Sequence, residues 1–426
     1  MNKFYIAGLG AALFLAAAVG IQAQEEQQEN APRVDIQRLS IGRADLKNKT
    51  MDIVPEKILS AATGKEISFD RMIDEMRDVR YVYVGETHNS LPMHDLQFKV
   101  AEALYKQDRN LAIGLEMYDV TWQEKLNHWS QGLWTEDEFI HKAGWYVNWN
   151  FHFNYYKKIF DLAKDYKIPL YALNAPRPAI RKVRMMGWTA LSDDEKAIIP
   201  EPDLTNEDHK TLLTAIFGQT EMPEAMKNMG DMMLQSLIRA QSAWDEVMAK
   251  YTRLAARAEG GRVMVLVGSG HLLYNLGINH RVYKKDPSPF KTVLCVTIPE
   301  GETQVTVQRS LADYILGIPE EEKPVYPSDG IALKKFDGLD NPVIERDPIT
   351  GVAKGQDFKK GDVVLAVDGT SYTSINALRT YMSRFNWGDS VTFKLLREAK
   401  EITVTLKYEM SPEEAEEANL TACFRM

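Results

Sequence analysis

The chain has 426 residues, of which 45% are hydrophobic, 26% charged and 10% aromatic, and this composition excludes disordered, collagenous and coiled-coil proteins. Its 60 acidic and 51 basic side chains give a formal net charge of −9 without any Lys/Arg-rich run, which argues against a nucleic-acid partner. The two cysteines, Cys295 and Cys423, lie far apart, so we expect neither a disulfide scaffold nor a cysteine-based metal site.

Residues 1–23 have the pattern of a signal peptide, because Lys3 precedes an apolar run at 4–21 and the chain then turns to Gln and Glu. We expect cleavage after Ala23 and a soluble protein in the periplasm or another exported compartment. The alternative is an uncleaved membrane anchor, since the run is nearly long enough to span a bilayer. A polar lead-in at 24–50 follows.

Four apolar runs, each ending at a polar or Gly-containing turn, alternate with helical patterns at residues 81–84, 111–117, 170–173 and 263–267. This alternation predicts an α/β domain over residues 51–312, with a mostly parallel sheet flanked by helices. The strongly helical stretch at about 177–259 predicts a helical insertion between two strands of that sheet.

The chain changes character after this domain. Residues 313–327 are rich in Pro and Glu and predict a linker. Short β patterns punctuated by glycines, with one helix, predict a small β-rich domain at 328–410, and an acidic tail follows at 411–426.

Within the small domain, KKGDVVLAVDG and WGDSVTFKLLRE resemble the core of bacterial PDZ domains. The resemblance implies that the C-terminus of a peptide or protein partner adds a strand to the sheet edge, with its carboxylate held by backbone N–H groups. The matching loop is Gly330, Ile331, Ala332 and Leu333, in which Ala332 replaces the usual second glycine. On the facing helix, Leu378 and Met382 would shape the side-chain pocket; the alternative is that they are core residues.

Polar residues follow the predicted strands of the large domain at the points where the strands stop: Glu86, His88, Glu116, Asn174 and His271. Ligands of open α/β sheets bind beyond the carboxyl ends of the strands. Two carboxylates and two imidazoles suit a divalent metal, and equally a metal-free general base oriented by a carboxylate. The alternative is that His88 and His271 cap helices or bond to the backbone, and that Glu116 pairs with Arg177 or Arg181.

Two further polar residues lie on predicted helices. For His94, a direct role and an exposed or supporting role are equally expected, and Asp245 is most simply a helix-surface or interhelix partner.

Five motifs occur in an order and spacing that resemble the ChaN-like haem-binding uptake family, within the larger group of Tiki proteases and erythromycin esterases: GETHNSLPMHDLQ, GLEMYD, YALNAPR, IRAQSAWDEVMA and VGSGHLLYNLG. The resemblance covers about residues 55–300. It implies an α/β domain that binds haem iron at a protein surface for iron acquisition, often as a homodimer with paired haems. It also implies a tyrosine ligand, for which the candidates are Tyr118, Tyr146, Tyr155 and Tyr156. His141 and His152 lie in the same aromatic stretch and remain unassigned.

Two hypotheses follow. The first is a haem- or iron-binding protein whose PDZ-like domain docks a partner. The second is an esterase- or peptidase-type hydrolase in which Glu86, His88, Glu116 and His271 bind a metal or activate water. A serine hydrolase is disfavoured, because VGSGH lacks the spacing of the nucleophile elbow.

Overall fold

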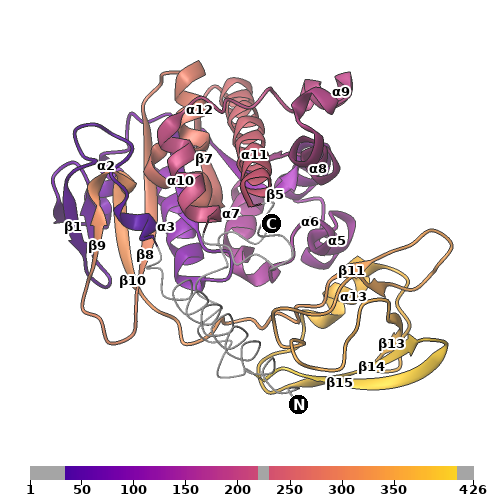
Figure 1. The fold of residues 1–426 in the computed structure, drawn as a ribbon. Coiled ribbons are helices and arrows are strands. Elements are labelled where there is room, and N and C mark those ends of the chain that lie inside the picture. The colour runs from indigo at the N-terminus through magenta and orange to yellow at the C-terminus, as the bar shows by residue number, and fades with distance from the viewer. Residues whose placement is uncertain (1–33, 219–229, 410–426) are drawn as a thin grey trace, which may run out of the picture.

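The computed structural model describes residues 34–218 and 230–409. The predicted signal peptide and the acidic tail lie outside the described residues. The chain forms a large α/β domain and a small β-rich domain beside it (Figure 1). The fold class expected from the sequence is therefore confirmed.

The large domain is built on an eight-stranded sheet in the order β3-β2-β10-β8-β4-β7-β5-β6. The strands from β10 to β6 run parallel, and β2 and β3 add an antiparallel edge. Their bounds are β2 (Ile58–Ser60), β3 (Lys65–Ile67), β4 (Tyr81–Glu86), β5 (Leu111–Asp119), β6 (Leu170–Asn174), β7 (Arg262–Gly268), β8 (Phe290–Ile298) and β10 (Tyr314–Pro319). A separate antiparallel pair joins β1 (Thr50–Ile53) and β9 (Val305–Gln308).

Helices cover both faces of this sheet, which is why its central strands are apolar on both sides. One face packs on a layer that includes α2 (Phe69–Asp74), α3 (Leu91–Gln107), α4 (Gln123–Ser130), α5 (Glu136–Lys142), α6 (Trp145–Asn148) and α7 (Lys157–Tyr166). The other face packs on α10 (Glu207–Phe217), α11 (Gly230–Glu259) and α12 (Ile278–Lys285). In β4, Val82 and Val84 enter the first layer and Tyr81 and Tyr83 the second.

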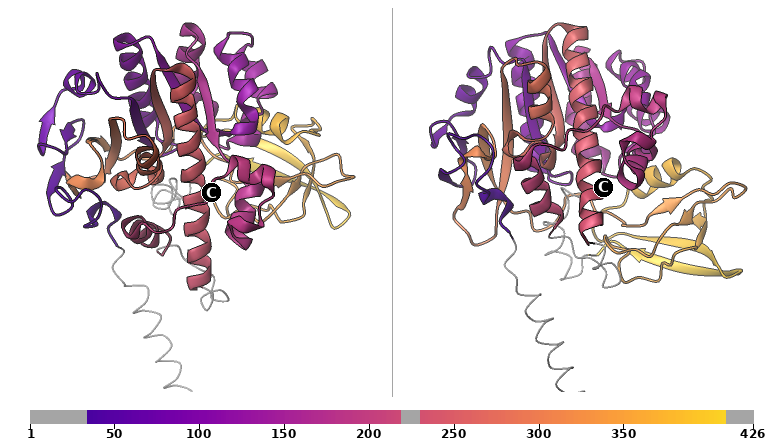
Figure 2. Two further views of the ribbon diagram at one scale, coloured as in Figure 1. Left: turned by 90° about the horizontal axis from the view of Figure 1, so that it is seen from above. Right: turned by 45° about the horizontal axis from the view of Figure 1, so that its top comes forward.

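The described chain between β6 and β7 is helical. It contains α8 (Arg177–Met186), α9 (Asp193–Ile198), α10 and α11, and α8 packs on α11 through a small apolar cluster. Figure 2 shows α11 as the long helix that lies over one face of the sheet. Short 3-10 helices complete the connections: η1 (Ile36–Arg38), η2 (Val120–Trp122), η3 (Phe153–Tyr155), η4 (Trp188–Ala190), η6 (Ser269–His271), η7 (Leu273–Asn275) and η8 (Arg309–Leu311).

The structure corrects the predicted linker at 313–327. Tyr314–Pro319 forms β10, which pairs in parallel with β8, so the large domain extends past residue 312. Gly317 and Pro319 suggest a linker in the sequence, but Tyr314, Ile315 and Ile318 are buried in the domain core.

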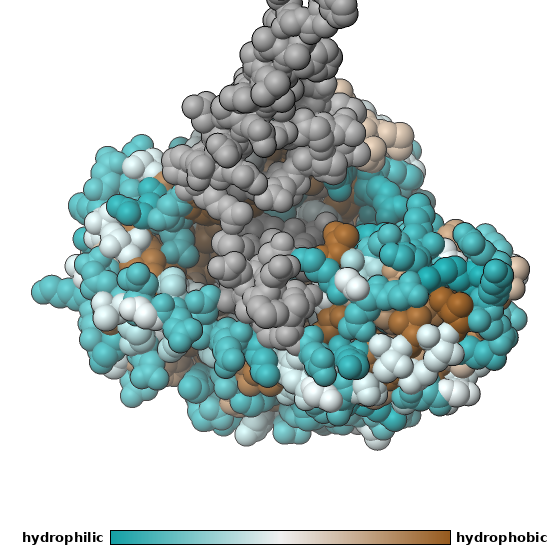
Figure 3. Space-filling view, turned by 60° about the horizontal axis from the view of Figure 1, so that its bottom comes forward, coloured by the Kyte–Doolittle hydropathy of each residue, from teal (hydrophilic) through white to brown (hydrophobic). Residues whose placement is uncertain are grey.

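The small domain is a five-stranded antiparallel sheet in the order β11-β12-β13-β14-β15 with one helix. Its elements are β11 (Leu333–Lys334), β12 (Val343–Ile344), β13 (Val363–Val367), α13 (Ile375–Met382), β14 (Ser390–Arg397) and β15 (Lys400–Lys407). No helix among residues 34–218 and 230–409 is long and apolar enough to cross a membrane. On the face in Figure 3, polar residues predominate and hydrophobic residues form separate patches.

Candidate functional site

The carboxyl ends of three adjacent strands bring the predicted polar residues together. β7 lies between β4 and β5, and Glu86 at the end of β4 is level with Gly268 at the end of β7. Glu116 lies in β5, and His271 ends η6, directly after β7. Glu86, His88, Glu116 and His271 are 0%, 4%, 1% and 3% exposed, respectively. These four residues are called the strand-end cluster below.

Glu86 lies at one end of this cluster, between two imidazoles. One carboxylate oxygen is 2.7 Å from Nδ1 of His88, and the other is 2.8 Å from Nδ1 of His94. The Tyr156 hydroxyl also donates to Glu86, at 3.1 Å. His94 is 2% exposed, so the expectation of an exposed position is wrong.

Glu116 lies between the two predicted imidazoles. Its Oε2 accepts the Gly268 N–H at 2.6 Å, and its Oε1 is 3.4 Å from Nε2 of His271. Burial alone raises the pKa of Glu116, but His271, His88 and the Gly268 N–H outweigh it, so this pKa is lowered overall. Glu116 is therefore an ionised carboxylate inside the protein.

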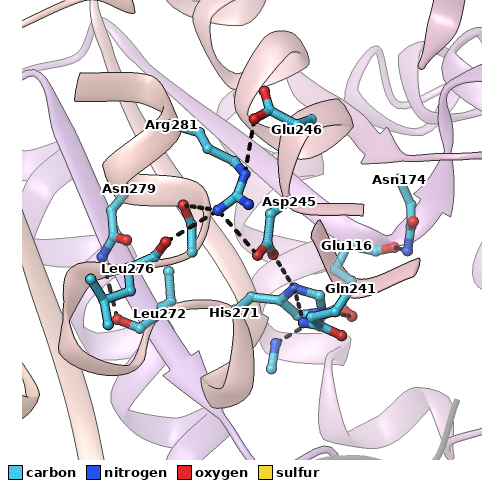
Figure 4. Close-up of polar contacts among 12 residues, drawn as sticks. Glu116, Asn174, Gln241, Asp245, Glu246, His271, Leu272, Leu276, Asn279 and Arg281 are labelled. Carbon is cyan, nitrogen blue, oxygen red and sulfur yellow. Dashed lines mark hydrogen bonds and ion pairs between the residues drawn. The ribbon is translucent and has the colours of Figure 1, made fainter. Parts of the chain in front are cut away.

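A second carboxylate–imidazole pair lies on the other side of Glu116 (Figure 4). Nδ1 of His271 is 2.6 Å from Asp245 Oδ1 and 2.8 Å from Gln241 Nε2. The other oxygen of Asp245 is 3.4 Å from Nε2 of His209 and 3.5 Å from Arg281. Asp245 is 0% exposed, so the expectation of a helix-surface position is wrong, while its contacts with α10 and α12 do make it an interhelix partner.

The buried carboxylates favour the charged form of both imidazoles. Burial alone lowers the pKa of His271, but Glu116 and Asp245 outweigh it and raise that pKa to about 10. The pKa of His88 is also raised, because Glu86 and then Glu116 outweigh its burial. At neutral pH His271 is therefore an imidazolium, and a metal ion that binds the cluster competes with protons there.

The cluster contains a donor set for a metal. Among the described residues, Glu86, His88 and Glu116 each offer one ligand atom, and these atoms lie within 4.8 Å of one another. The absence of a side chain at Gly268 keeps this space open, because a Cβ there would lie 2.9 Å from Cε1 of His88 and 3.6 Å from Oε2 of Glu116. Two carboxylates and an imidazole are chemically suitable ligands for a divalent metal.

Residues 145–156, called the cover segment below, lie over His88 and Glu86. The rings of Trp149 and Phe151 have centroids 4.7 Å and 4.8 Å from that of His88. The Trp149 indole N–H donates to the Tyr156 hydroxyl at 2.9 Å, and Tyr156 in turn donates to Glu86. The cover segment thus contributes both the aromatic wall and one hydrogen-bond donor of the cluster.

A surface cleft of about 210 Å³ is lined in part by Trp149. Its lining is part apolar, from Met117, Trp122, Val147 and Trp149, and part polar, from Asp119, Asn148, Asn174 and Arg177. Val147 is 50% exposed, so an apolar side chain lies open to solvent at the rim. Asn174 connects the cleft to the cluster, because its side-chain amide donates to the Glu116 carbonyl at 2.9 Å.

The four candidate haem-ligating tyrosines are all buried. Tyr118, Tyr146, Tyr155 and Tyr156 are 0%, 5%, 4% and 1% exposed, and none of them lines the cleft. The hydroxyl of Tyr118 is buried without a hydrogen-bond partner, among the rings of Trp122, Phe139 and Trp145. His141 is exposed, whereas His152 is half-buried.

The small domain rests on the cover segment. The Asn376 side chain, on α13, accepts the Tyr146 N–H at 3.2 Å and donates to the carbonyls of Ile140 and His141 at 3.2 Å and 3.3 Å. Nε2 of His152 is 2.8 Å from the Ser383 carbonyl oxygen. The helix of the small domain therefore holds the start of the segment that covers His88.

The predicted peptide-binding residues lie where α13 meets the first strand of the small domain. Leu378 and Met382 are buried in the core of this domain. Ile331 is also buried, while Gly330, Ala332 and Leu333 are half-buried. The chain between Ser328 and Lys335 thus forms the edge of the sheet, next to the helix.

Sequence reasoning missed the partners of the cluster: Gln241, Asp245, His209 and Arg281. Gln241 and Asp245 are four residues apart and therefore lie on one face of α11, which is a helical-spacing signal present in the motif AQSAWDEVMA. Nothing comparable marks His209 or Arg281.

Two family models match the chain. Residues 72–282 match the family described as haem-binding uptake, Tiki superfamily, ChaN, and residues 330–408 match the PDZ domain. A curated relative, a probable periplasmic serine endoprotease DegP-like protein of Bartonella henselae, is 24% identical over 144 residues, which are 33% of this chain and 27% of that protein. The chain therefore spans about a quarter of the length of this relative.

Two solved structures show more distant likeness. One, of cofacial heme binding to ChaN of Campylobacter jejuni, is 21% identical, covers 61% of this chain and 95% of its own, and has a TM-score of 0.48. The other, an erythromycin esterase in its open conformation, is 11% identical, covers 59% and 83%, and has a TM-score of 0.35. With both family matches in place, the chain combines a domain of the ChaN-like haem-binding uptake family with a C-terminal PDZ domain.

Proposed function

We propose that this chain is an exported haem-binding protein that serves iron acquisition, and that its PDZ domain recognises a peptide or protein partner. The observation that carries the proposal is the match of residues 72–282 to the haem-binding uptake family. The signal-peptide pattern at residues 1–23 supports export, and the DegP-like relative, which matches part of the chain, is named as periplasmic. A homodimer that holds paired haems belongs to the same proposal.

The cleft beside Trp149 fits part of a haem. Haem is a flat apolar ring with two carboxylates, so its site needs an open apolar wall and a cationic group. Trp122, Val147 and Trp149 supply the wall, and the Arg177 guanidinium lies at the rim, where it donates to the Asn148 carbonyl at 2.7 Å. At about 210 Å³ the cleft is smaller than the roughly 300–1,000 Å³ of enclosing ligand pockets, which suits a haem held at a surface.

The tyrosine ligand of the haem iron fits the cleft less directly. The four tyrosines are buried, and burial raises the pKa of each hydroxyl, which disfavours the tyrosinate that binds ferric iron. A tyrosine ligand therefore has to leave its place for the iron. Tyr118 and Tyr146 are next in sequence to the cleft residues Met117 and Val147, so the shortest backbone movements bring these two to the haem.

A hemin titration of residues 24–426, read by visible absorption, tests the proposal. We expect saturable uptake with a Soret shift and a tyrosinate-like spectrum, lost in one of the four Tyr→Phe variants at 118, 146, 155 and 156 and retained in the others. The three unaffected variants serve as matched controls. Light scattering before and after hemin addition tests the dimer. Absence of saturable uptake in the wild type contradicts the proposal.

A second candidate function is hydrolysis of an ester or amide bond. The observation that favours it is the buried donor set of Glu86, His88 and Glu116, flanked by the Asp245–His271 pair. Asp245 orients His271 toward Glu116, and Glu86 orients His88, as carboxylates orient imidazoles in catalytic sites. When bound, a divalent metal supplies Lewis-acid assistance to hydrolysis at such a site.

Metal analysis of the untreated protein separates the two candidates. A stoichiometric divalent metal that disappears in His88→Ala, together with hydrolysis of a p-nitrophenyl ester panel that needs both His88 and His271, supports the hydrolase. Asn127→Ala, on the exposed surface of α4, is a control that leaves both readouts unchanged. Equal hydrolysis by wild type and both histidine variants contradicts this second candidate.

A further inference from the structure

The edge strand of the PDZ domain is crossed by a salt bridge from the facing helix. β11 is at the edge of the sheet and pairs only with β12 among the described strands. Nη1 of Arg379, on α13, donates to both oxygens of Asp329, at 2.6 Å and 2.7 Å. Nη2 of the same guanidinium donates to the Ile331 carbonyl. Arg379 therefore connects α13 to the loop that enters β11.

The Asp329 carboxylate is held by the kinds of group that bind an anionic ligand. Besides Arg379, it accepts the backbone N–H of Ile331 at 2.8 Å. The side chains of Asp329 and Arg379 are only 9% and 17% exposed. A carboxylate held by a loop N–H and a largely buried guanidinium is a charge-assisted arrangement that a free carboxylate could share.

Arg379 binds the chain before β11 on its unpaired side, which is the side where a peptide strand would add to the sheet. The Ala332 carbonyl accepts the Glu345 N–H, so it faces the strand β12 side. Successive carbonyls of an extended strand alternate in direction, and the Ile331 carbonyl therefore points to the open side, where Arg379 occupies it. Just after β11, Nζ of Lys335 donates to the carbonyl of Thr373, two residues before α13, at 2.9 Å.

We propose that Asp329 occupies the site that receives the C-terminal carboxylate of a ligand, and that Arg379 and the Ile331 N–H are the groups that bind that carboxylate when Asp329 leaves. The inference rests on the proposed peptide recognition by the PDZ domain. The ligand class is a protein or peptide with a free α-carboxylate, because a departing Asp329 leaves a buried guanidinium that needs a replacement anion.

This arrangement lowers the apparent affinity of the groove. A tethered carboxylate competes at a high effective concentration, and a ligand binds only the fraction of molecules in which the groove is open. Removal of the Asp329 charge therefore strengthens ligand binding, whereas loss of an ordinary contact residue weakens it. This opposite sign separates the proposal from a purely structural salt bridge.

The experiment uses residues 24–426 and an array of decapeptides made twice, with free C-terminal carboxylates and with C-terminal amides. Affinities of the best binders are then measured by fluorescence anisotropy. We expect Asp329→Asn to bind the free-carboxylate peptides about tenfold more tightly than the wild type. The amides should bind this variant at least about tenfold more weakly than the acids. The double variant with Arg379→Gln should lose the gain.

Asp357→Asn is the matched control, because Asp357 pairs with Arg397 at 2.7 Å in the same domain and is 64% exposed. It should leave peptide affinity unchanged. Asp329→Ser repeats the charge removal should the Asn variant fail to fold, as judged by thermal unfolding.

Three outcomes overturn the proposal: no gain in a folded Asp329 variant, equal binding of acids and amides, or no binding of a free C-terminus by any variant. In the second case, peptide recognition survives and only this assignment fails. In the third, the proposed peptide recognition fails with it.

Discussion

Gly268→Ala tests whether the close approach of His88 and Glu116 depends on the missing side chain between them. Gly268 has φ −54° and ψ 137°, which an alanine adopts without backbone strain, so the substitution acts through its methyl group alone. That methyl would lie 2.9 Å from Cε1 and 3.4 Å from Nε2 of His88, and 3.6 Å from Oε2 of Glu116.

The neighbours of the new methyl group have little room to yield. His88 is held by Glu86 at 2.7 Å and lies against the Trp149 and Phe151 rings. A retreat of several tenths of an ångström therefore lengthens a buried ionic hydrogen bond or moves the cover segment. Overpacking of this kind costs about 1–3 kcal/mol, and we expect the free energy of unfolding to fall by that amount.

Urea unfolding measures the stability, and isothermal titration with Zn²⁺ or Mn²⁺ measures whether the donor set still holds a metal. Gly114→Ala is the matched control, because its methyl meets a Leu173 side chain at 2.6 Å in the core of the same sheet. We expect a similar loss of stability in both variants and loss of metal uptake in Gly268→Ala alone. Wild-type stability in Gly268→Ala, or equal metal uptake by the two variants, would refute the reasoning.

Three further predictions concern the buried ion pairs and the domain contact. Glu86→Gln removes the carboxylate that His88 and His94 both contact and leaves buried hydrogen-bonding groups imperfectly paired, so we expect a loss of about 1–3 kcal/mol in urea unfolding, and wild-type stability would contradict it. Asn376→Ala leaves buried backbone groups unpaired at a cost of about 1–3 kcal/mol and should speed proteolysis between the domains, whereas an unchanged cleavage rate would contradict the contact. Burial lowers the pKa of His152 and outweighs the opposite effect of the Ser383 carbonyl. The unfolded chain therefore binds a proton at a higher pH than the folded chain does, so the free energy of unfolding should fall as pH drops from about 6.5 to the folded pKa. This fall should be smaller in His152→Phe. An equal pH dependence in that variant would contradict the assignment.

The parallel sheet could be predicted because its central strands are buried on both faces. Tyr81–Glu86 and Arg262–Gly268 are fully buried strands, so each appears in the sequence as a continuous apolar run that stops at a polar residue. The polar residues at these strand ends also indicate the strand-end cluster, because parallel strands end at one edge of the sheet. β10 could not be predicted this way, because its glycine and proline are typical of a linker.

The partners of the cluster could not be predicted, because they depend on how helices cross the sheet. Asp245 lies on a helix whose sequence suits an exposed face equally well, and only the packing of α11 against β7 brings it to His271. The positions of the tyrosines could not be predicted for a related reason. A dense aromatic stretch predicts both a haem face and a core, and the structure uses Tyr118 and Tyr156 in the core.

The contact of Asn376 with the cover segment has a thermodynamic consequence for the whole molecule. Helix α13 contacts the loop of the proposed peptide site through Arg379 and the residues that lie over His88 through Asn376. A peptide that shifts α13 on binding therefore changes the free energy of the cover segment. A haem or metal that shifts the cover segment in turn changes the free energy of the proposed peptide site. By linkage the two effects are equal. The factor by which a bound C-terminus changes haem or metal affinity is the factor by which bound haem or metal changes the affinity for that C-terminus.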